Sequence, residues 1–372
     1  MKILLFGGTG AMGRNLGAIL AEQGHMVTVT TRQQRKSLCP NIEYIVGNAH
    51  EGSFLRRLLE RARYDVVVDF MLYSVQEFSS RIDYMLGSVG QYVFLSSSRV
   101  YADTKEPITE KTPRLLDVCS DSAYLDTDEY ALAKARQEDR LLESSLGNWT
   151  IIRPYITFDD YRFQLGGVEK ESWLYRSLCG RRIVFSRDIA QHITTMTSGR
   201  DVAEMIAAVI GNEIAKGEIF NTVTNESHRW SEILDTYLSV LRDVQGFNPA
   251  VCMTNECPLL TEPGGPIYQI RYDRLYDRIF DNEKIMRMMA RDWRPRPVLD
   301  MLSRSLKNFL SSPRWASVPF FREAAFDRIS GDVRKVGEFD TWKYYMLYLL
   351  YRFCGYKTAE RLRGFIHPLR RN

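Results

Sequence analysis

The chain has 372 residues, of which 45% are hydrophobic and 26% are charged, as in an ordinary soluble globular protein. This length suffices for two domains, or for one large domain with insertions. The formal net charge of +4 is too small to indicate, by itself, a nucleic-acid partner.

The first thirty residues predict a strand, a turn, a helix and a second strand. The apolar run Lys2–Phe6 predicts a buried strand, and a glycine-rich turn follows it directly. From Arg14 onward, apolar residues recur at helical spacing until Gly24, a residue type that commonly ends helices. The next run, His25–Thr30, predicts another strand. This order and spacing are those of a mononucleotide-binding βαβ unit.

The turn carries glycines at three-residue intervals, namely Gly7, Gly10 and Gly13. Gly7 permits a sharp turn at the strand end, Gly10 permits a pyrophosphate to approach the backbone, and Gly13 permits close helix packing. The N-terminus of the following helix offers N–H groups and a partial positive charge to phosphates, and we expect Ala11 and Met12 of the turn to contact the cofactor as well. A glycine turn that only connects strand and helix is the alternative, but the flanking elements favour a dinucleotide site.

The end of the second predicted strand bears on which dinucleotide is bound. An NAD site usually places an acidic residue there to bind the ribose 2′-hydroxyl, whereas an arginine accommodates the 2′-phosphate of NADP. This chain has Arg32 at that point, followed by Arg35 and Lys36, with no acidic residue between Glu22 and Glu43. We therefore expect NADP as the cofactor, with NAD as the second possibility. A solvated basic loop is the alternative interpretation.

Strands and helices continue to alternate up to about residue 155. Apolar or β-branched runs predict strands at Ile42–Val46, Asp65–Phe70 and Gln91–Leu95. Helical patterns lie between them, over residues 52–63 and 76–89. The fold class expected from this alternation is α/β, with a Rossmann-like doubly wound parallel sheet.

Tyr130 and Lys134 lie four residues apart in a segment rich in Ala, Leu, Glu and Arg, which predicts a helix. This spacing places the phenol and the ammonium on one helix face. A positive charge beside the phenol lowers its pKa, so that the tyrosine can exchange a proton near neutral pH. A tyrosine and a lysine at this spacing are more often a surface pair. Here the pair is better evidence for a catalytic role, because it follows the glycine turn and a strand that ends in serines.

These residues resemble those of the extended short-chain dehydrogenase/reductases, a family that includes nucleotide-sugar epimerases, dehydratases and reductases. The resemblance spans residues 1–235, and its specific motifs lie in the first 155. It implies that Ser97 holds the reacting oxygen, that Tyr130 is the acid/base and that Lys134 binds the cofactor ribose. The residues that carry the resemblance are Gly7, Gly10, Gly13, Ser96–Tyr101, Tyr130, Lys134, Arg153, Pro154, Gly199–Ala203 and Gly217–Asn221.

Three residues, Ser98, Arg99 and Asn48, depart from the pattern of that family. Family dehydratases follow the catalytic Ser or Thr with an Asp-Glu pair, and this chain has Ser98 and Arg99 there. The departure argues against a 4,6-dehydratase, because that pair removes and returns protons during the loss of water. Asn48 replaces the acidic residue that often follows the third strand and holds adenine. We still expect Asn48 to line the cofactor site.

The expected organisation has three parts. Residues 1–155 form the dinucleotide-binding domain, and its sheet is completed by a return of the chain at about residues 195–225. Residues 156–300 form a smaller α+β substrate-binding part, and residues 301–372 form a helical C-terminal extension.

The extension contains an apolar segment, Trp342–Phe353, that is too short to span a membrane. It could lie on a membrane surface, or it could be a helix packed on the domain or on a partner, which we favour. The basic residues in and after it are Arg352, Lys357, Arg361, Arg363, Arg370 and Arg371.

The sequence favours an NAD(P)-dependent oxidoreductase or epimerase that acts by hydride transfer at a sugar carbon of a nucleotide-sugar. The alternative is a non-catalytic, dinucleotide-sensing or RNA-associated scaffold of the same fold. We expect a homodimer, no DNA partner and no metal, since the five histidines show no ligand spacing. The six cysteines lack CxxC spacing and no signal-peptide pattern is present, so we expect reduced thiols and a cytoplasmic protein.

Overall fold

The computed structural model describes residues 1–262 and 265–366, with side chains described up to Arg361. The chain forms two compact units, and each unit is assembled from three separate segments. The first unit comprises Met1–Asp159, Ile193–Ser227 and Asp277–Met301, and the second comprises Asp160–His192, His228–Tyr276 and the described residues from Leu302 onward.

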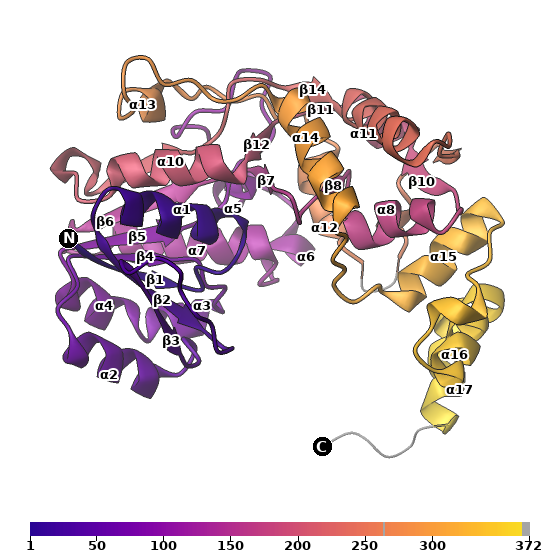
Figure 1. Ribbon diagram of the computed structural model, residues 1–372, viewed down its shortest axis with the longest axis horizontal. Helices are drawn as coiled ribbons and strands as arrows, with labels where there is room; N and C mark the ends of the chain where they lie inside the picture. The colour runs from indigo at the N-terminus through magenta and orange to yellow at the C-terminus, as the bar shows by residue number, and fades with distance from the viewer. Residues whose placement is uncertain (263–264, 367–372) are drawn as a thin grey trace. The chain divides into compact units, whose positions relative to one another are not determined.

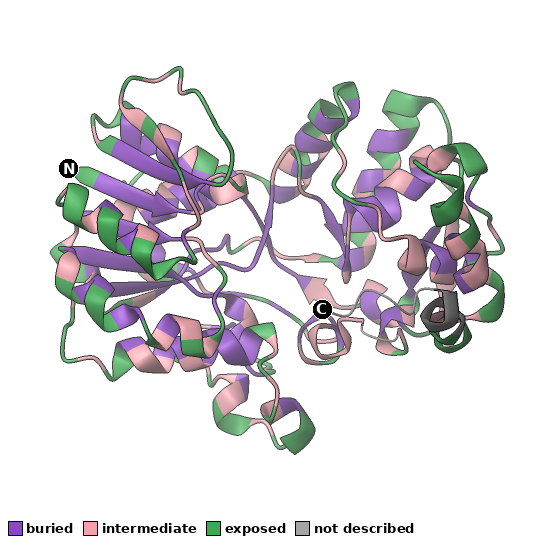
Figure 2. Cartoon of the chain, turned by 90° about the horizontal axis from the view of Figure 1, so that it is seen from below, coloured by how far each residue is buried: buried purple, intermediate pink, exposed green. Residues whose placement is uncertain are grey.

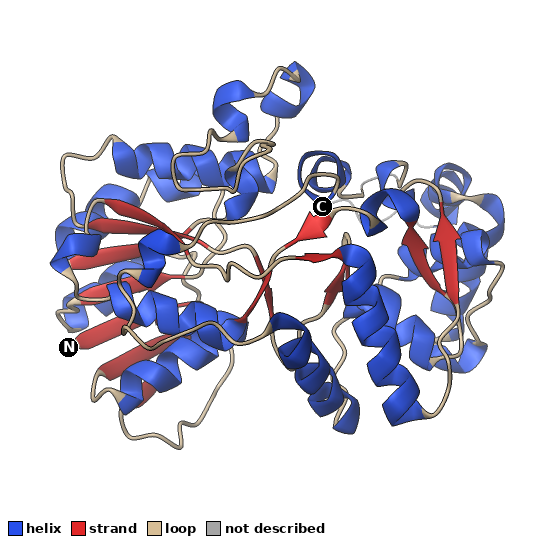
Figure 3. Cartoon of the chain, turned by 90° about the horizontal axis from the view of Figure 1, so that it is seen from above, coloured by secondary structure: helices blue, strands red, loops and turns tan. Residues whose placement is uncertain are grey.

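The first unit is built on a seven-stranded sheet. Its strands are β1 (Lys2–Phe6), β2 (Met26–Thr31), β3 (Ile42–Val46), β4 (Val66–Asp69), β5 (Gln91–Leu95), β6 (Trp149–Arg153) and β13 (Glu218–Asn221). They follow the order β13-β6-β5-β4-β1-β2-β3, and every neighbouring pair is parallel (Figure 3). The chain starts at β1, adds β2 and β3 on one side, and then crosses to β4 on the other side. This topology confirms the predicted Rossmann-like doubly wound α/β fold and places a topological switch point between β1 and β4.

Helices cover both faces of this sheet (Figure 1). The helices of the first unit are α1 (Ala11–Glu22), α2 (Gly52–Arg61), α3 (Val75–Ser79), α4 (Ile82–Ser88), η1 (Ser98–Val100), α5 (Leu115–Val118), α6 (Ser122–Leu125), α7 (Tyr130–Leu142), α10 (Gly199–Val209), η2 (Glu213–Ala215) and α13 (Glu283–Met286). The first unit also contains the parallel pair β7 (Ile156–Phe158) and β12 (Met196–Ser198), and the short strand β11 (Ile193–Thr194).

Two apolar layers, one on each face, hold the sheet of the first unit. Ile3 and Leu5 of β1 pack with α1 and α10, whereas Leu4 and Phe6 pack with α2, α3 and α4. Successive side chains of a strand point to opposite faces, so the continuous apolar run of β1 serves both layers. Most strands of the sheet are coloured as buried in Figure 2. All four of these β1 side chains are fully buried. Each such side chain contributes about 1.5–3 kcal/mol to the stability of the sheet.

The predicted helix over residues 76–89 is wrong in one respect, because the structure divides it into α3 and α4. Ser80 and Arg81 separate the two helices. The Arg81 guanidinium donates to the backbone carbonyls of Ala49 and His50, at 2.9 and 2.8 Å. These acceptors lie in a loop about thirty residues earlier in the chain, so the apolar periodicity of the helix does not reveal the break.

The second unit has little sheet and several helices. Its strands are the antiparallel pair β8 (Gln164–Leu165) and β9 (Val168–Glu169), the parallel pair β10 (Ile183–Ser186) and β15 (Val251–Thr254), and β14 (His228–Arg229). Its helices are α8 (Lys170–Leu178), α9 (Arg187–Ala190), α11 (Trp230–Gln245), η3 (Pro258–Leu260), α12 (Ile267–Gln269), η4 (Ile270–Arg274), α14 (Val298–Ser311, which begins in the first unit), α15 (Phe320–Ser330), η5 (Val336–Glu338), α16 (Trp342–Cys354) and α17 (Tyr356–Ile366). Trp173 and Tyr237 stack in its interior with ring centroids 4.5 Å apart.

The chain returns to the first unit twice. Strand β13 completes the sheet, within the range of residues 195–225 in which the sequence predicts a return. The sequence division assigns residues 277–300 to the substrate-binding part, but together with Met301 they group with the first unit. Arg278 anchors this second return, because its guanidinium donates to the backbone carbonyls of Tyr101 and Ala102 at 3.1 and 3.2 Å.

Candidate active site

The glycine turn joins β1 to α1. Gly7 has φ +66°, a left-handed conformation that favours glycine. A β-carbon on Gly13 would lie 2.5 Å from the α-carbon of Gly8, so Gly13 is required for the close packing of α1 on the turn. A β-carbon on Gly10 would meet no atom within 4 Å. The left-handed backbone at Gly7 and the close packing at Gly13 are therefore those of a dinucleotide-binding turn. The open space beside Gly10 fits an approaching pyrophosphate.

Gly8 is a fourth required glycine that sequence reasoning did not single out. A β-carbon there would lie 2.9 Å from the β-carbon of Leu5. Ala11 and Met12 form the start of α1, three residues before the helical pattern that the sequence shows from Arg14, and the first turn of α1 contains no acidic residue. The positive end of the helix dipole is thus not neutralised by a side chain of its own helix.

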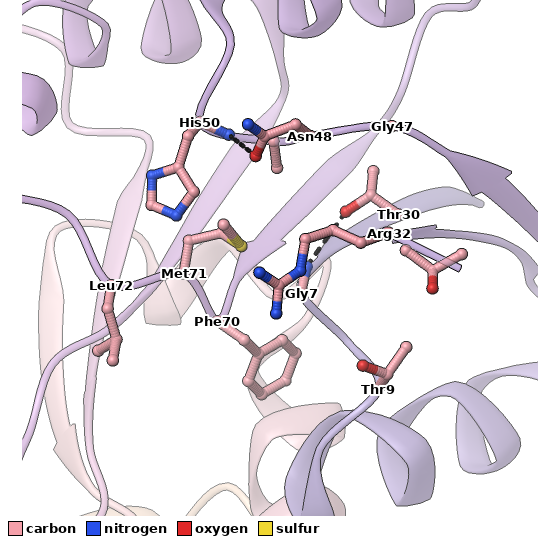
Figure 4. Close-up of a pocket in the computed structure, with 12 residues that line it drawn as sticks. Gly7, Thr9, Thr30, Arg32, Gly47, Asn48, His50, Phe70, Met71 and Leu72 are labelled. Atoms are coloured by element: carbon pink, nitrogen blue, oxygen red, sulfur yellow. Dashed lines mark hydrogen bonds between the residues drawn. The ribbon is translucent and has the colours of Figure 1, made fainter. Parts of the chain in front are cut away.

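A cavity of about 290 Å³ lies beyond the carboxyl ends of β1, β2, β3 and β4 (Figure 4). The backbone N–H of Gly7 donates to the hydroxyl of Thr30 at 3.1 Å, which ties the glycine turn to the end of β2. The lining residues are Gly7, Thr9, Thr30, Thr31, Arg32, Gly47, Asn48, Ala49, His50, Phe70, Met71 and Leu72.

Arg32 and Asn48, both predicted from the sequence, line this cavity in different ways. The side chain of Arg32 extends into it (Figure 4). Among the described residues, no carboxylate forms an ion pair with the Arg32 guanidinium. Asn48 instead organises its own loop: its carbonyl oxygen accepts from the backbone N–H of His50 at 3.2 Å. His50, which the sequence did not indicate, pairs with Glu77 at 2.8 Å on the wall of the cavity.

The three predicted catalytic residues lie where β5 ends and α7 begins. Ser97 is buried and precedes η1, and its hydroxyl oxygen accepts from the backbone N–H of Arg99 at 3.2 Å. Tyr130 is the first residue of α7 and is 36% exposed. The Arg99 guanidinium lies 5.3 Å from the centroid of the Tyr130 ring, so Arg99 connects the serine and the tyrosine.

Glu129 fixes the position of Arg99. Its carboxylate accepts from the Arg99 guanidinium at 2.6 Å and from the backbone N–H of Ala131 at 2.8 Å. Glu129 therefore caps the N-terminus of α7 and holds the cation that lies over Tyr130. Sequence reasoning missed this pair because the two residues are thirty positions apart.

Lys134 lies one turn after Tyr130 and is fully buried. Its ammonium donates to the backbone carbonyl of Leu95 at 2.6 Å and lies 4.5 Å from the centroid of the Phe94 ring. Burial lowers the pKa of Lys134 to about 8, although the negative charges of Asp69 and Glu138 oppose this shift.

Asp69, at the end of β4, is the buried carboxylate near Lys134. It accepts hydrogen bonds from the hydroxyls of Tyr92 and Tyr73, at 2.8 and 3.1 Å, and from the backbone N–H of Met71 at 2.9 Å. Burial raises the pKa of Asp69, and the hydrogen bonds and Lys134 oppose the rise. An acidic residue that ends a strand of three valines is the one signal in the sequence that could have indicated this cluster.

A buried ion pair braces α7 against the strand ends. Arg153 donates to both carboxylate oxygens of Glu138, at 2.6 and 2.8 Å, and to the hydroxyl of Tyr101 at 2.8 Å. The hydroxyl of Ser96 also donates to Glu138, at 2.5 Å. Tyr101 in turn donates to the side-chain oxygen of Asn221 at 2.7 Å. Because β6, α7, β13 and the segment directly after β5 each supply a group, this network fixes the helix that carries Tyr130 and Lys134.

Part of the first unit matches a known protein family. The model of the NAD dependent epimerase/dehydratase family matches residues 3–87. The predicted family resemblance is confirmed. The match to the NAD dependent epimerase/dehydratase family covers β1 to α4, the part of the chain that forms the glycine turn and the cavity.

One curated relative and two solved structures are informative. The chloroplast stem-loop binding protein of 41 kDa b from Arabidopsis thaliana is 27% identical over 235 residues, which cover 59% of this chain and 58% of the relative. The dTDP-glucose 4,6-dehydratase from Bacillus anthracis, in complex with NAD, is 16% identical with a TM-score of 0.63, over 85% of this chain and 98% of that chain. The UDP-glucuronic acid 4-epimerase from Bacillus cereus, in complex with UDP-glucuronic acid and NAD, is 15% identical with a TM-score of 0.62, over 84% of this chain and 99% of that chain. At these identities the two structures establish the fold.

Within residues 1–262 and 265–366, no cluster of three or more His, Cys, Asp or Glu side chains has the arrangement of a metal site.

Proposed function

We propose that the chain is an NAD(P)-dependent oxidoreductase or epimerase that acts at a sugar carbon of a nucleotide-sugar. The observation that carries this proposal is that Arg99 contacts both Tyr130, at the start of α7, through its guanidinium and Ser97 through its backbone N–H. The glycine turn and the cavity at Arg32 belong to the same unit. The family match and the nucleotide-sugar enzymes among the solved structures support it.

In the proposed reaction, the chain moves one proton at the substrate oxygen. A nicotinamide ring, when bound, accepts a hydride from the sugar carbon or returns one to a keto-sugar. Tyr130 takes the proton of the hydroxyl that is oxidised and gives it back when the carbonyl is reduced. The positive charge of Arg99 near the ring favours the phenolate form of Tyr130.

Ser97 and Lys134 position the reactants in this proposal. The Ser97 oxygen accepts from the backbone N–H of Arg99, so its hydroxyl proton can be donated to the substrate oxygen. The Lys134 ammonium uses one of its three N–H groups on Leu95, and the others bind the cofactor ribose. Lys134 also adds a positive charge one turn from Tyr130.

The proposed cofactor is NADP(H), with NAD(H) as the second choice. Arg32 lines the cavity without a described carboxylate partner, and therefore offers its N–H groups to a 2′-phosphate. The two solved structures named above are complexes with NAD, which supports a nicotinamide dinucleotide as the cofactor. The preference for NADP rests on Arg32 alone.

Replacing Tyr130 tests the proposal. Tyr130→Phe removes the hydroxyl, and we expect turnover of nucleotide-sugars and their keto forms to fall by about 10²–10⁴-fold. Tyr84→Phe is a matched control, because Tyr84 is also 36% exposed and also has an arginine, Arg56, over its ring. Equal losses in both variants, or full activity in Tyr130→Phe, would contradict the assignment. A reductase releases oxidised cofactor in each cycle, whereas an epimerase retains the cofactor.

A second candidate function is an RNA-associated scaffold of the same fold. The observation that favours it is the Arabidopsis relative, whose name describes stem-loop binding. Tight, salt-sensitive binding of RNA stem-loops without any turnover would support this candidate. Turnover that disappears in Tyr130→Phe would exclude a purely non-catalytic role.

A further inference from the structure

Helix α16 is held on the second unit by one of its faces. Tyr348 and Tyr351 are buried and face α15. The Tyr348 hydroxyl donates to the carboxylate of Asp327 at 2.6 Å and accepts from the backbone N–H of Arg334 at 2.7 Å. The Arg328 side chain donates to the backbone carbonyls at the end of α16, including that of Tyr351. These contacts fix which side of α16 faces inward, in agreement with the packed helix that the sequence favoured.

The opposite side of α16 carries a row of exposed apolar side chains. Trp342, Met346 and Phe353 are 70%, 51% and 69% exposed. Leu349 lies between them in the sequence and is partly buried against the apolar cluster that contains Tyr348 and Tyr351. Their spacing of four, three and four residues places them on one helix face. Single exposed apolar residues are ordinary on protein surfaces, but three large ones aligned on one helix face mark an interaction surface. We call these four residues the α16 stripe.

The charges around the α16 stripe are mainly positive. Lys343 and Arg352 lie on its two flanks, and Arg352 is 5.2 Å from the centroid of the Phe353 ring. Within residues 342–361, Lys357 and Arg361 on α17 are also exposed. The one acid in that span is Glu360, whose carboxylate accepts from the Tyr351 hydroxyl. Exposed Asp340 lies just before α16 and is outnumbered by these cations.

We propose that the α16 stripe binds the surface of a lipid bilayer that contains anionic phospholipids. Helices with an apolar face and basic flanks lie in the plane of the interface, where the apolar side chains enter the acyl region and the cations meet headgroup phosphates. Tryptophan and other aromatic side chains favour that interface. Among residues 1–262 and 265–366, no helix is both long enough and apolar enough to cross a membrane, so the contact is with the surface.

Other occupants fit the α16 stripe less well. Two copies that packed stripe to stripe would bring Lys343 and Arg352 of each copy close to like charges. A single strand of RNA would stack on the aromatic rings of Trp342 and Phe353, but Met346 and Leu349 between them offer no ring. Acyl chains contact aliphatic and aromatic side chains alike. Arg370 and Arg371 lie outside the described residues, and the side chain of Arg363 is not described.

Vesicle flotation of the full-length chain tests this proposal. We expect the protein to float with vesicles of phosphatidylglycerol and phosphatidylcholine but to remain unbound with phosphatidylcholine alone. The variant Trp342→Ser/Met346→Ser/Phe353→Ser loses the apolar anchors, and its apparent affinity should fall at least about ten-fold. Lys343→Glu/Lys357→Glu keeps the apolar stripe, and its affinity should fall by about ten-fold and lose its dependence on salt.

A matched control distinguishes binding through the α16 stripe from nonspecific hydrophobic binding to vesicles. Leu146→Ser/Ile214→Ser/Val244→Ser removes three apolar side chains that are exposed elsewhere, and it should float like the wild type. Thermal unfolding checks that each variant is folded. If the triple serine variant is unfolded, the flotation of Lys343→Glu/Lys357→Glu tests the proposal instead. Wild-type protein that stays unbound with anionic vesicles overturns the proposal, as does equal flotation of all variants. A dimer or an RNA complex that only the serine variant loses, without flotation of the wild type, assigns the surface to that partner instead.

Discussion

Gly10 and Gly13 lie three residues apart at the cofactor turn, and the surroundings of their α-carbons differ. A β-carbon on Gly13 would collide with the backbone of Gly8, whereas one on Gly10 would enter open space. The sequence pattern alone predicts both roles, close helix packing at Gly13 and room for a pyrophosphate at Gly10. It does not predict how tight the packing at Gly13 is, because that depends on the distance between the turn and α1 in the folded chain.

Alanine substitutions at these two positions should therefore have different effects. We expect Gly13→Ala to lower the free energy of unfolding by about 1–3 kcal/mol through overpacking. Gly10→Ala should leave that free energy within about 0.5 kcal/mol of the wild type while it weakens dinucleotide binding. Denaturant unfolding and cofactor titration measure the two effects. Unchanged cofactor affinity in Gly10→Ala would show that no pyrophosphate lies beside Gly10.

Arg32 is the residue that should decide between the two dinucleotides. If it faces the 2′-phosphate, Arg32→Ala should weaken NADPH binding by about one to two decades and leave NADH binding nearly unchanged. Arg35→Ala is the control, since Arg35 is close in sequence but does not line the cavity. Calorimetric titration of both cofactors provides the measurement. Equal affinity of the wild type for NADPH and NADH would refute the assignment.

Lys134 gives the folded chain a distinct dependence on pH. Burial lowers its pKa from 10.5 to about 8, so between these values the unfolded chain holds a proton that the folded chain has released. The free energy of unfolding should therefore rise with pH in this window, by up to about 1.4 kcal/mol per pH unit from this group. Lys134→Met lacks the group, so the wild type should gain stability relative to the variant between about pH 8 and 9.5. A difference that does not change with pH would contradict this.

At the scale of elements, the position of the helix that carries Tyr130 and Lys134 depends on the buried Glu138–Arg153 ion pair, which braces that helix and which no local sequence pattern predicts. The helical composition and the spacing of the two residues indicate α7 correctly. Its orientation, however, is set by Glu138 and Arg153, which come from different elements and meet only in the folded sheet. The break between α3 and α4 has the same origin, since Arg81 is held by carbonyls of a distant loop.

Breaking the brace should destabilise the first unit. Glu138→Ala leaves the Arg153 guanidinium buried without its carboxylate, and we expect the free energy of unfolding to fall by about 3–5 kcal/mol. The double variant Glu138→Ala/Arg153→Ala should lose less than the sum of the two single losses, because the pair is coupled. Urea unfolding of the four proteins in this cycle measures the coupling. Additive losses would mean that the ion pair is not a unit.

At the scale of the whole molecule, the sequence predicts the doubly wound sheet but not the division of the chain into units. The strands of the sheet are continuous apolar runs, and their alternation with helices is visible along the sequence. Residues 277–301 join the first unit through polar contacts, such as those of Arg278 with backbone carbonyls and of Arg296 with Glu204 at 3.0 Å. Contacts of this kind connect distant segments and leave no periodic signal. The glycines and Arg32 of the candidate site were predictable for the opposite reason, since their roles depend on neighbours in the sequence.

A thermal-shift titration with nicotinamide dinucleotides tests the central claim most directly, because every proposed chemical step requires a bound cofactor. Binding to the folded state alone raises the melting temperature by mass action. We predict that NADPH and NADP raise it in a concentration-dependent manner, more strongly than NADH and NAD, and that Gly10→Ala reduces the shift. A melting temperature that no nicotinamide dinucleotide changes would contradict the account.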